Sequence, residues 1–291
     1  MKALFTSRNL IGDSLGISAA LRAWHRDHPE YEIDLLTNND HVAELYRGMG
    51  VPLNVIFEVE KFTVPMDGQD VPCTTEYDFE FTFNVNQAFA ICDQEQVPMS
   101  VGYARLLKVD IGENQADIGP FYDPPIVEAD QELIDSVPDD VILIAPFSAS
   151  CASHDGKPPN KTLPWPKWAG IMRYLRTLGK PIRVTGSAKE RADQLKLSEE
   201  EYLLGFPLRP LARVMREKTW LLVSVDNGIS HLAGSQKIPH VLFYPMCLGL
   251  HYAVPWGNPK VIPIHIEPAL VEPAQLPWTV KQAVQHLETL R

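Results

Sequence analysis

The chain has 291 residues, of which 45% are hydrophobic and 22% are charged, a composition typical of a globular protein with a sizeable core. The 37 acidic and 26 basic side chains give a net charge of -11, which argues against a protein that coats DNA or RNA through a basic surface. The sequence contains no run of about 18 apolar residues, so it predicts no membrane span. Arg8 interrupts the N-terminal segment before an apolar signal core develops, so we expect a cytoplasmic protein.

The charge is unevenly distributed along the chain. Residues 1–128 carry 21 acidic and 8 basic side chains, a net charge of -13, whereas residues 129–291 carry a net charge of +2. This asymmetry predicts two domains with different partners and favours an anionic ligand on the second. Four cysteines stand far apart without the spacing of a zinc site, and we expect them to be reduced thiols: Cys73, Cys92, Cys151 and Cys247.

Strands and helices are predicted to alternate along the first half. Apolar side chains at Ile17, Ala20, Leu21 and Trp24 give the first helix one apolar face. The expected strands are 2–6, 31–37, 53–57 and 78–83, and the expected helices are 12–28, 41–49, 86–94 and 100–109. A stretch with several Gly and Pro residues at 119–140 then predicts a linker.

The same alternation resumes after the linker. Strands are expected at 141–145, 181–185, 220–225 and 240–244, and helices at 166–178, 188–197, 208–218, 228–236 and, after a Pro-rich stretch, 279–290. This rhythm predicts two doubly wound α/β domains with a ligand in the cleft between strand ends. We assign 1–128 to the first domain, 129–274 to the second, and 275–291 to a C-terminal helix that is a candidate to pack back on the first domain.

Gly12 and Asp13 open the first helix after the first strand. A helix N-terminus at a strand end faces the ligand cleft of such a sheet, where a carboxylate can act as a general base. The alternative is that Asp13 only caps the helix by accepting hydrogen bonds from its first turn, although Ser14 offers another cap.

Three further stretches place small or charged residues at predicted helix starts. Lys161 precedes a helix and either reaches a phosphate or is a surface lysine of a Pro-rich loop. After Gly186, Glu190 either interacts with a helix N-terminus or accepts hydrogen bonds from a ribose diol. The run DNGISH at 226–231 exposes backbone N–H groups suited to an anion. Its plainer interpretation is an aspartate that caps the helix and a histidine that packs in the first turn.

Four segments together resemble the family 9 glycosyltransferases, whose best-known members are the ADP-heptose:lipopolysaccharide heptosyltransferases. They are GDSLGISAALRAWHRDHPEYEIDLLT, ILIAPFSAS, KTLPWPKWAGIMRYLRTLGKPIRVTGSAKE and SVDNGISHLAGSQKIPHVLFYP. Residues 60–135 carry little resemblance. The resemblance implies a GT-B fold, in which two Rossmann-like doubly wound domains face a cleft. The acceptor then binds the first domain and the nucleotide sugar binds the second.

The resemblance also implies an inverting glycosyltransferase with a nucleoside diphosphate sugar such as ADP-heptose as its donor. Asp13 matches the carboxylate that deprotonates the acceptor hydroxyl, and Lys161 matches the lysine that neutralises the donor diphosphate. The residues that match nucleotide-binding motifs are Gly186 and Glu190 of a G-x-x-x-E turn, and Asp226, Asn227, Gly228, Ile229 and His231 of a D-x-G-x-x-H loop. No metal-binding motif is visible, so the expected enzyme uses neither a metal nor a further cofactor.

The sequence departs from the family in several places. Leu163 replaces the tryptophan of the family's K-x-W-P pattern, and Asn227 replaces a serine or threonine, so that an amide would contact phosphate in place of a hydroxyl. The first half is short and acidic, whereas lipopolysaccharide acceptors are anionic. A local basic patch from Arg8, Arg105 and Lys108 is the candidate that would offset this charge.

Two other functions remain open from the sequence. One is a nucleotide-sugar epimerase of GT-B fold, which needs additional acid and base carboxylates that we cannot place. The other is a catalytically silent protein that binds a nucleotide sugar or a protein partner. For a transferase, the acceptor is a carbohydrate or another hydroxyl compound, and the net charge disfavours nucleic acid.

Overall fold

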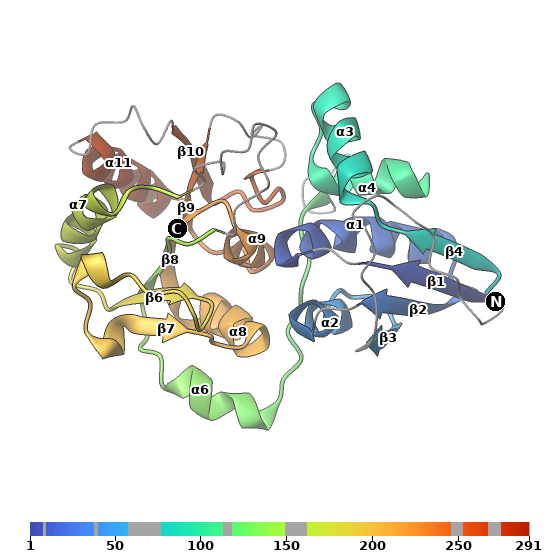
Figure 1. Ribbon diagram of the computed structural model, residues 1–291, viewed down its shortest axis with the longest axis horizontal. Helices are drawn as coiled ribbons and strands as arrows, with labels where there is room; N and C mark the ends of the chain where they lie inside the picture. Colours follow the sequence, from blue (N-terminus) through green and yellow to red (C-terminus); the bar gives the residue numbers. More distant parts are fainter. Residues whose placement is uncertain are drawn as a thin grey trace.

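The computed structural model describes residues 1–7, 10–37, 40–57, 77–112, 118–148, 162–245, 253–266 and 275–290. Within these residues two parallel sheets form, each covered by helices (Figure 1). Lys161, Arg8 and three of the cysteines (73, 151 and 247) lie outside the described residues. The predictions made for them stay predictions.

The first sheet has the strand order β3-β2-β1-β4 and is parallel throughout. Its strands are β1 (Lys2–Thr6), β2 (Glu32–Thr37), β3 (Leu53–Phe57) and β4 (Phe79–Thr82), and its helices are α1 (Ile11–Asp27), α2 (Asp40–Arg47), α3 (Val85–Glu95) and α4 (Met99–Leu107). The predicted apolar face of α1 is fully buried, and Trp24 packs edge-on against Phe5 of β1 with ring centroids 5.0 Å apart. Burial of this face holds α1 on the sheet.

The second sheet has the order β10-β9-β8-β5-β6-β7 and is also parallel throughout. Its strands are β5 (Val141–Ala145), β6 (Ile182–Gly186), β7 (Tyr202–Leu204), β8 (Thr219–Val225), β9 (His240–Pro245) and β10 (Val261–Ile266). The α-helices of this half are α7 (Trp165–Arg176), α8 (Leu208–Lys218), α9 (Gly228–Ser235) and α11 (Gln275–Thr289). The order is that of a Rossmann sheet, in which ligands bind beyond the carboxyl ends of the strands where the winding reverses, here between β5 and β8.

The central strand β5 shows how the second sheet is packed. All five of its residues are buried, as expected for a parallel strand with both faces covered. Val141, Leu143 and Ala145 join the core cluster that also contains the first half, α8 and α9. Ile142 and Ile144 join a separate cluster with α7 and α11. One face of the second sheet therefore shares an apolar core with the first half.

The short linker elements η1 (Glu128–Asp130) and α6 (Gln131–Asp135) fall inside the predicted linker. The predicted boundary at residue 128 lies between the two sheets, and its exact placement stays a prediction. The C-terminal helix α11 packs on α7 and β9 within the second half, so its predicted return to the first domain is wrong. Its buried side chains Leu276, Val280, Val284 and Leu287 complete the core on that face of the second sheet.

One further expectation fails in the second half, and two strands there were not predicted. The helix expected at 188–197 does not form, because this stretch consists of a turn followed by the 3-10 segment η2 (Asp193–Leu195). The strands β7 and β10 were not predicted, and they are the two edge strands of the second sheet. β7 has only three residues, and β10 contains Pro263. Proline has no backbone N–H to donate to a second neighbouring strand, so it is tolerated in an edge strand but not in a central one.

No helix within the described ranges is long and apolar enough to cross a membrane.

Candidate active site

The N-terminal turns of α1 and α9 meet between the two halves of the molecule (Figure 1). A Cβ atom added at Gly12 of α1 would lie 2.9 Å from Cδ2 of His231, and one added at Gly228 of α9 would lie 2.8 Å from Cβ of Ile11. Each glycine therefore allows the other helix to approach closely. Because α1 follows β1 and α9 follows β8, this contact joins the carboxyl ends of the two sheets.

Asp13 is the third residue of α1 and is half-buried. The N-cap of α1 is Leu10, which makes no side-chain capping bond, and Ser14 already donates its backbone N–H to the Leu10 carbonyl at 2.9 Å. Neither Asp13 nor Ser14 is thus the N-cap, and both capping alternatives from the sequence are wrong. The carboxylate instead stands in the first turn, where the helix dipole stabilises a negative charge.

Two fully buried phenols lie within electrostatic range of Asp13. Burial raises the pKa of Tyr46 and of Tyr103 above the usual phenol value, and the charge of Asp13 raises both further. Tyr46 donates a short hydrogen bond to the hydroxyl of Ser7, which follows β1. Both phenols are therefore neutral and add no charge beside Asp13.

The first turn of α9 is closed by a capping box. Asn227 is the N-cap. Its side-chain oxygen accepts a hydrogen bond from the N–H of Ser230 at 2.9 Å, and its own N–H donates to the Ser230 hydroxyl at 3.3 Å. The Asn227 amide nitrogen donates to the carbonyls of Phe147 at 2.7 Å and Ala145 at 3.3 Å. Asn227 thus ties α9 to the end of β5. The expectation that its amide contacts a phosphate fails, because that amide is committed to these bonds.

Asp226 precedes the cap and does not serve as one. Its backbone N–H donates to the carbonyl of Phe243, its carbonyl accepts the hydroxyl of Ser148, and one carboxylate oxygen lies 3.5 Å from Nε2 of His231. Since the box takes up the N–H of Ser230, the N–H groups of Gly228 and Ile229 are the ones that the first helical turn offers to an anion. Phosphate binding by these two N–H groups stays a prediction.

Gly186 and Glu190 form a turn at the end of β6. The Glu190 carboxylate accepts the N–H of Ser187 at 2.6 Å, so it closes the turn and does not open a helix. A Cβ at Gly186 would lie 2.6 Å from the ring of Phe147 and 2.7 Å from Glu190 Oε2. Gly186 is therefore required by close packing, whereas a contact of Glu190 with ribose stays a prediction.

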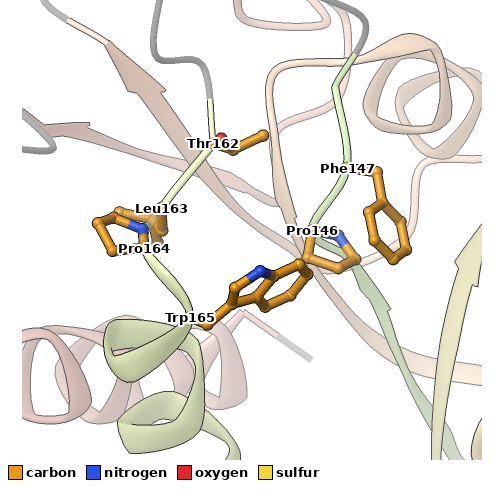
Figure 2. Close-up of a pocket in the computed structure, with 6 residues that line it drawn as sticks. All are labelled: Pro146, Phe147, Thr162, Leu163, Pro164 and Trp165. Carbon is orange, nitrogen blue, oxygen red and sulfur yellow. The ribbon is translucent and has the colours of Figure 1, made fainter. Parts of the chain in front are cut away.

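A small pocket opens beside this turn, at the end of β5 and the start of α7 (Figure 2). It has a volume of about 210 Å³ and its lining is Pro146, Phe147, Thr162, Leu163, Pro164 and Trp165. The rings of Phe147 and Trp165 meet edge-on, with centroids 5.9 Å apart. Leu163, which stands where the family has tryptophan, is buried in the lining.

One buried side chain of the second half was not foreseen from the sequence. His240 at the start of β9 is completely buried, and its Nε2 lies 2.7 Å from the Ser224 hydroxyl. Burial lowers the pKa of His240 to about 3, and the nearby His231 adds to this effect. The candidate basic patch is weakened, since Arg105 pairs with Glu95 at 3.3 Å. The described residues contain no group of three or more His, Cys, Asp or Glu residues that could hold a metal ion.

The two Rossmann-like sheets, joined at the N-termini of α1 and α9, have the architecture of the GT-B class. No family model matches the chain, and no curated protein matches it. Solved structures do match: a glycosyl transferase family 9 protein from Veillonella parvula DSM 2008 has a TM-score of 0.74 at 16% identity, over 100% of this chain and 97% of that one.

Two further matches have the same fold. The ADP-heptose lipopolysaccharide heptosyltransferase II of E. coli has a TM-score of 0.63 at 14% identity, over 98% of this chain and 99% of that one. The iron-containing heptosyltransferase TibC of enterotoxigenic E. coli, in complex with ADP-D-β-D-heptose, has a TM-score of 0.64 at 15% identity, over 98% of this chain and 77% of that one. The chain therefore has the GT-B fold that these glycosyltransferases share, as the sequence predicted.

Proposed function

We propose that the chain is an inverting glycosyltransferase of the family 9 type, which transfers a sugar from a nucleoside diphosphate to an acceptor hydroxyl. The contact between the N-terminal turns of α1 and α9 supports this function most directly. It brings the helix turn that carries Asp13 against the N-terminus of α9, whose backbone N–H groups are proposed to bind the diphosphate. Because the fold is similar to that of heptosyltransferases, we propose heptose or a hexose-like sugar as the transferred group and ADP as the nucleotide of the donor.

In the proposed reaction, Asp13 takes the proton of the acceptor hydroxyl as its oxygen attacks the anomeric carbon. The bond between that carbon and the diphosphate oxygen breaks on the opposite face, which inverts the configuration. The N–H groups of Gly228 and Ile229, together with Lys161, stabilise the charge that develops on the leaving diphosphate. Glu190 is proposed to accept hydrogen bonds from the ribose. A cytoplasmic location and independence from metals and other cofactors stay predictions.

A panel of nucleotide sugars, each incubated with and without candidate hydroxyl acceptors, tests the proposal. We expect release of nucleoside diphosphate that depends on the acceptor, with a product of inverted anomeric configuration by NMR. An epimerised nucleotide sugar formed without acceptor would replace the proposal with the epimerase. Tight binding of ADP or ADP-heptose without any product would replace it with a silent nucleotide-sugar binder.

A further inference from the structure

A single arginine on α8 connects three segments that are far apart in the sequence. The Arg209 guanidinium makes a two-pronged contact with the Asp130 carboxylate of η1, in which Nη2 to Oδ1 measures 2.9 Å, and its Nη1 contacts Oε1 of Glu44 on α2. α8 belongs to the second half, η1 to the linker and α2 to the first half. We call these three residues the Arg209 clasp.

The clasp is largely removed from solvent. Asp130 is 5% exposed, and the side chains of Arg209 and Glu44 are 24% and 25% exposed. The hydrogen bond from Arg209 lowers the pKa of Asp130 below its usual value. The buried hydroxyl of Tyr122 lies within electrostatic range of all three charges. A bidentate contact between a guanidinium and a carboxylate that are mostly buried fixes the distance and the orientation of the two side chains, unlike a solvent-exposed ion pair.

The clasp stands beside the contact that forms the candidate active site. α2 packs on α8 while α1 packs on α9, so two helices of the first half rest on two consecutive helices of the second. A second set of bonds holds the linker itself: Gln236 donates to the Tyr122 carbonyl at 2.8 Å, and Arg216 bonds to Gln236 and to Asp123. Between the two halves, the linker is thus fastened to the second half and not left as a free hinge.

We propose that Arg209 is a positioning residue, which sets the placement of the α1 N-terminus against the α9 N-terminus by clasping Glu44 and Asp130. The inference rests on the proposed function, because only a reaction that joins groups from both halves needs this placement. Asp13 is carried by the first half, whereas the proposed diphosphate site lies wholly on the second. Loss of the clasp should therefore reduce turnover while leaving nucleotide binding intact. A misplacement of about 1 Å costs on the order of 100-fold in rate.

The test compares Arg209→Met with Glu44→Met, which removes only the arm to the first half and leaves Arg209 paired with Asp130. The matched control is Arg176→Met, since Arg176 is an arginine of α7 that pairs with Glu201 at 3.1 Å within the second half. Three quantities are measured well below the melting temperature. They are ADP affinity by calorimetry, the rate of ADP release from ADP-D-β-D-heptose, and backbone hydrogen exchange at the hydrogen-bonded amides of the first turns of α1 and α9, those of Ser14 and Ser230.

For both clasp variants we expect kcat to fall about 10- to 100-fold, ADP affinity within about twofold of wild type, and faster exchange in the two first turns. The control should match wild type in all three. Glu44→Met keeps the test valid if Arg209→Met fails to fold. Turnover equal to wild type in Glu44→Met overturns the proposal, whether or not exchange accelerates, and so does an equal loss in the control.

Failure of the proposed function has a different signature. In that case the wild type releases no ADP from the donor, while exchange in the first turns still reports whether the clasp holds the two halves together. Unchanged exchange in both clasp variants would then also overturn the inference that Arg209 sets the placement of α1 against α9.

Discussion

Asp13 combines three local properties that a general base at a helix start requires. It stands in the first turn of α1, it is half-buried, and two phenols within electrostatic range of it, Tyr46 and Tyr103, are kept neutral by burial. A negative charge in the first turn of a helix is stabilised by the helix dipole, and the ionised carboxylate is the form that accepts a proton. Since the N-cap is Leu10, Asp13 is not needed as a cap and its loss should not unfold α1.

Replacing Asp13 by Asn should therefore separate catalysis from stability. We expect kcat to fall by about 10²- to 10⁴-fold, the usual contribution of general-base catalysis. Nucleotide affinity should stay near that of wild type, and the melting temperature should drop by only a few degrees, because the charge–dipole interaction is worth about 0.3–1 kcal/mol. Asp27→Asn, at the other end of α1, is the control and should turn over normally. Normal turnover in Asp13→Asn would assign the proton transfer to another group.

His240 gives a second prediction at the level of a single side chain. Its folded-state pKa of about 3 lies below the unfolded value of about 6.5, so the unfolded chain binds a proton that the folded chain does not. Its contribution to stability is complete above pH 6.5 and is lost as the pH falls from 6.5 towards 3.

Between pH 6 and pH 5 the free energy of unfolding of wild type should fall more steeply than that of His240→Gln, by about 1.4 kcal/mol per pH unit. Denaturant titrations of both proteins across this range measure the difference. Parallel curves would show that His240 is protonated in the folded state.

Among the elements, the close contact of α1 and α9 depends on two glycines, each of which leaves room for a different residue of the other helix. At Gly228 the obstacle to a side chain is Cβ of Ile11, which is fixed to the α1 backbone, whereas at Gly12 it is the edge of the His231 ring, which can rotate. In the proposed site, a side chain at Gly228 would also crowd the diphosphate. The structure shows that it would first separate the two helices.

Gly228→Ala should accordingly destabilise the protein by about 1–3 kcal/mol, the usual cost of overpacking, and lower turnover more than Gly12→Ala does. Gly16→Ala is the matched control on α1. Its added Cβ meets no atom closer than 3.6 Å, so helix propensity should make this variant more stable by about 0.5–1 kcal/mol. Thermal unfolding and turnover of the three variants measure both effects. If Gly228→Ala is as stable as wild type, the helices can separate without cost.

The elements that the sequence predicted well are those with strong periodicity and a buried face. α1 and β5 are examples, because their apolar patterns reflect burial that any two-layer packing would demand. β7 and β10 escaped prediction because edge strands are short and tolerate proline. The helix expected at 188–197 was wrong because Glu190 bonds back to Ser187. The motifs indicated the two turns for which nucleotide binding is proposed. Neither the pairing of Gly12 with His231 nor the Arg209 clasp follows from a local pattern, since each joins residues more than 75 positions apart.

On the scale of the whole molecule, the two halves form one packed body with unequal charge. Apolar residues of β5, α8 and α9 share a core with the first half, and the Arg209 clasp adds a polar contact at the same boundary. The net charge of -13 lies on the first half and +2 on the second. An anionic donor is therefore better placed on the second half, where the N-terminus of α9 adds a partial positive charge.

This distribution leads to a prediction about metals. The proposed neutralisation of the diphosphate uses the N–H groups of Gly228 and Ile229 together with Lys161, and it requires no divalent cation. Dialysis against EDTA and an iron chelator should therefore leave ADP release from ADP-D-β-D-heptose within about twofold of the rate before dialysis. If a metal stabilised the leaving group instead, its removal would cost several kcal/mol and turnover would be lost. Elemental analysis before and after dialysis verifies removal, including that of iron, which TibC contains. Loss of turnover that Mg²⁺, Mn²⁺ or Fe²⁺ restores would show that the helix N-terminus and lysine do not suffice.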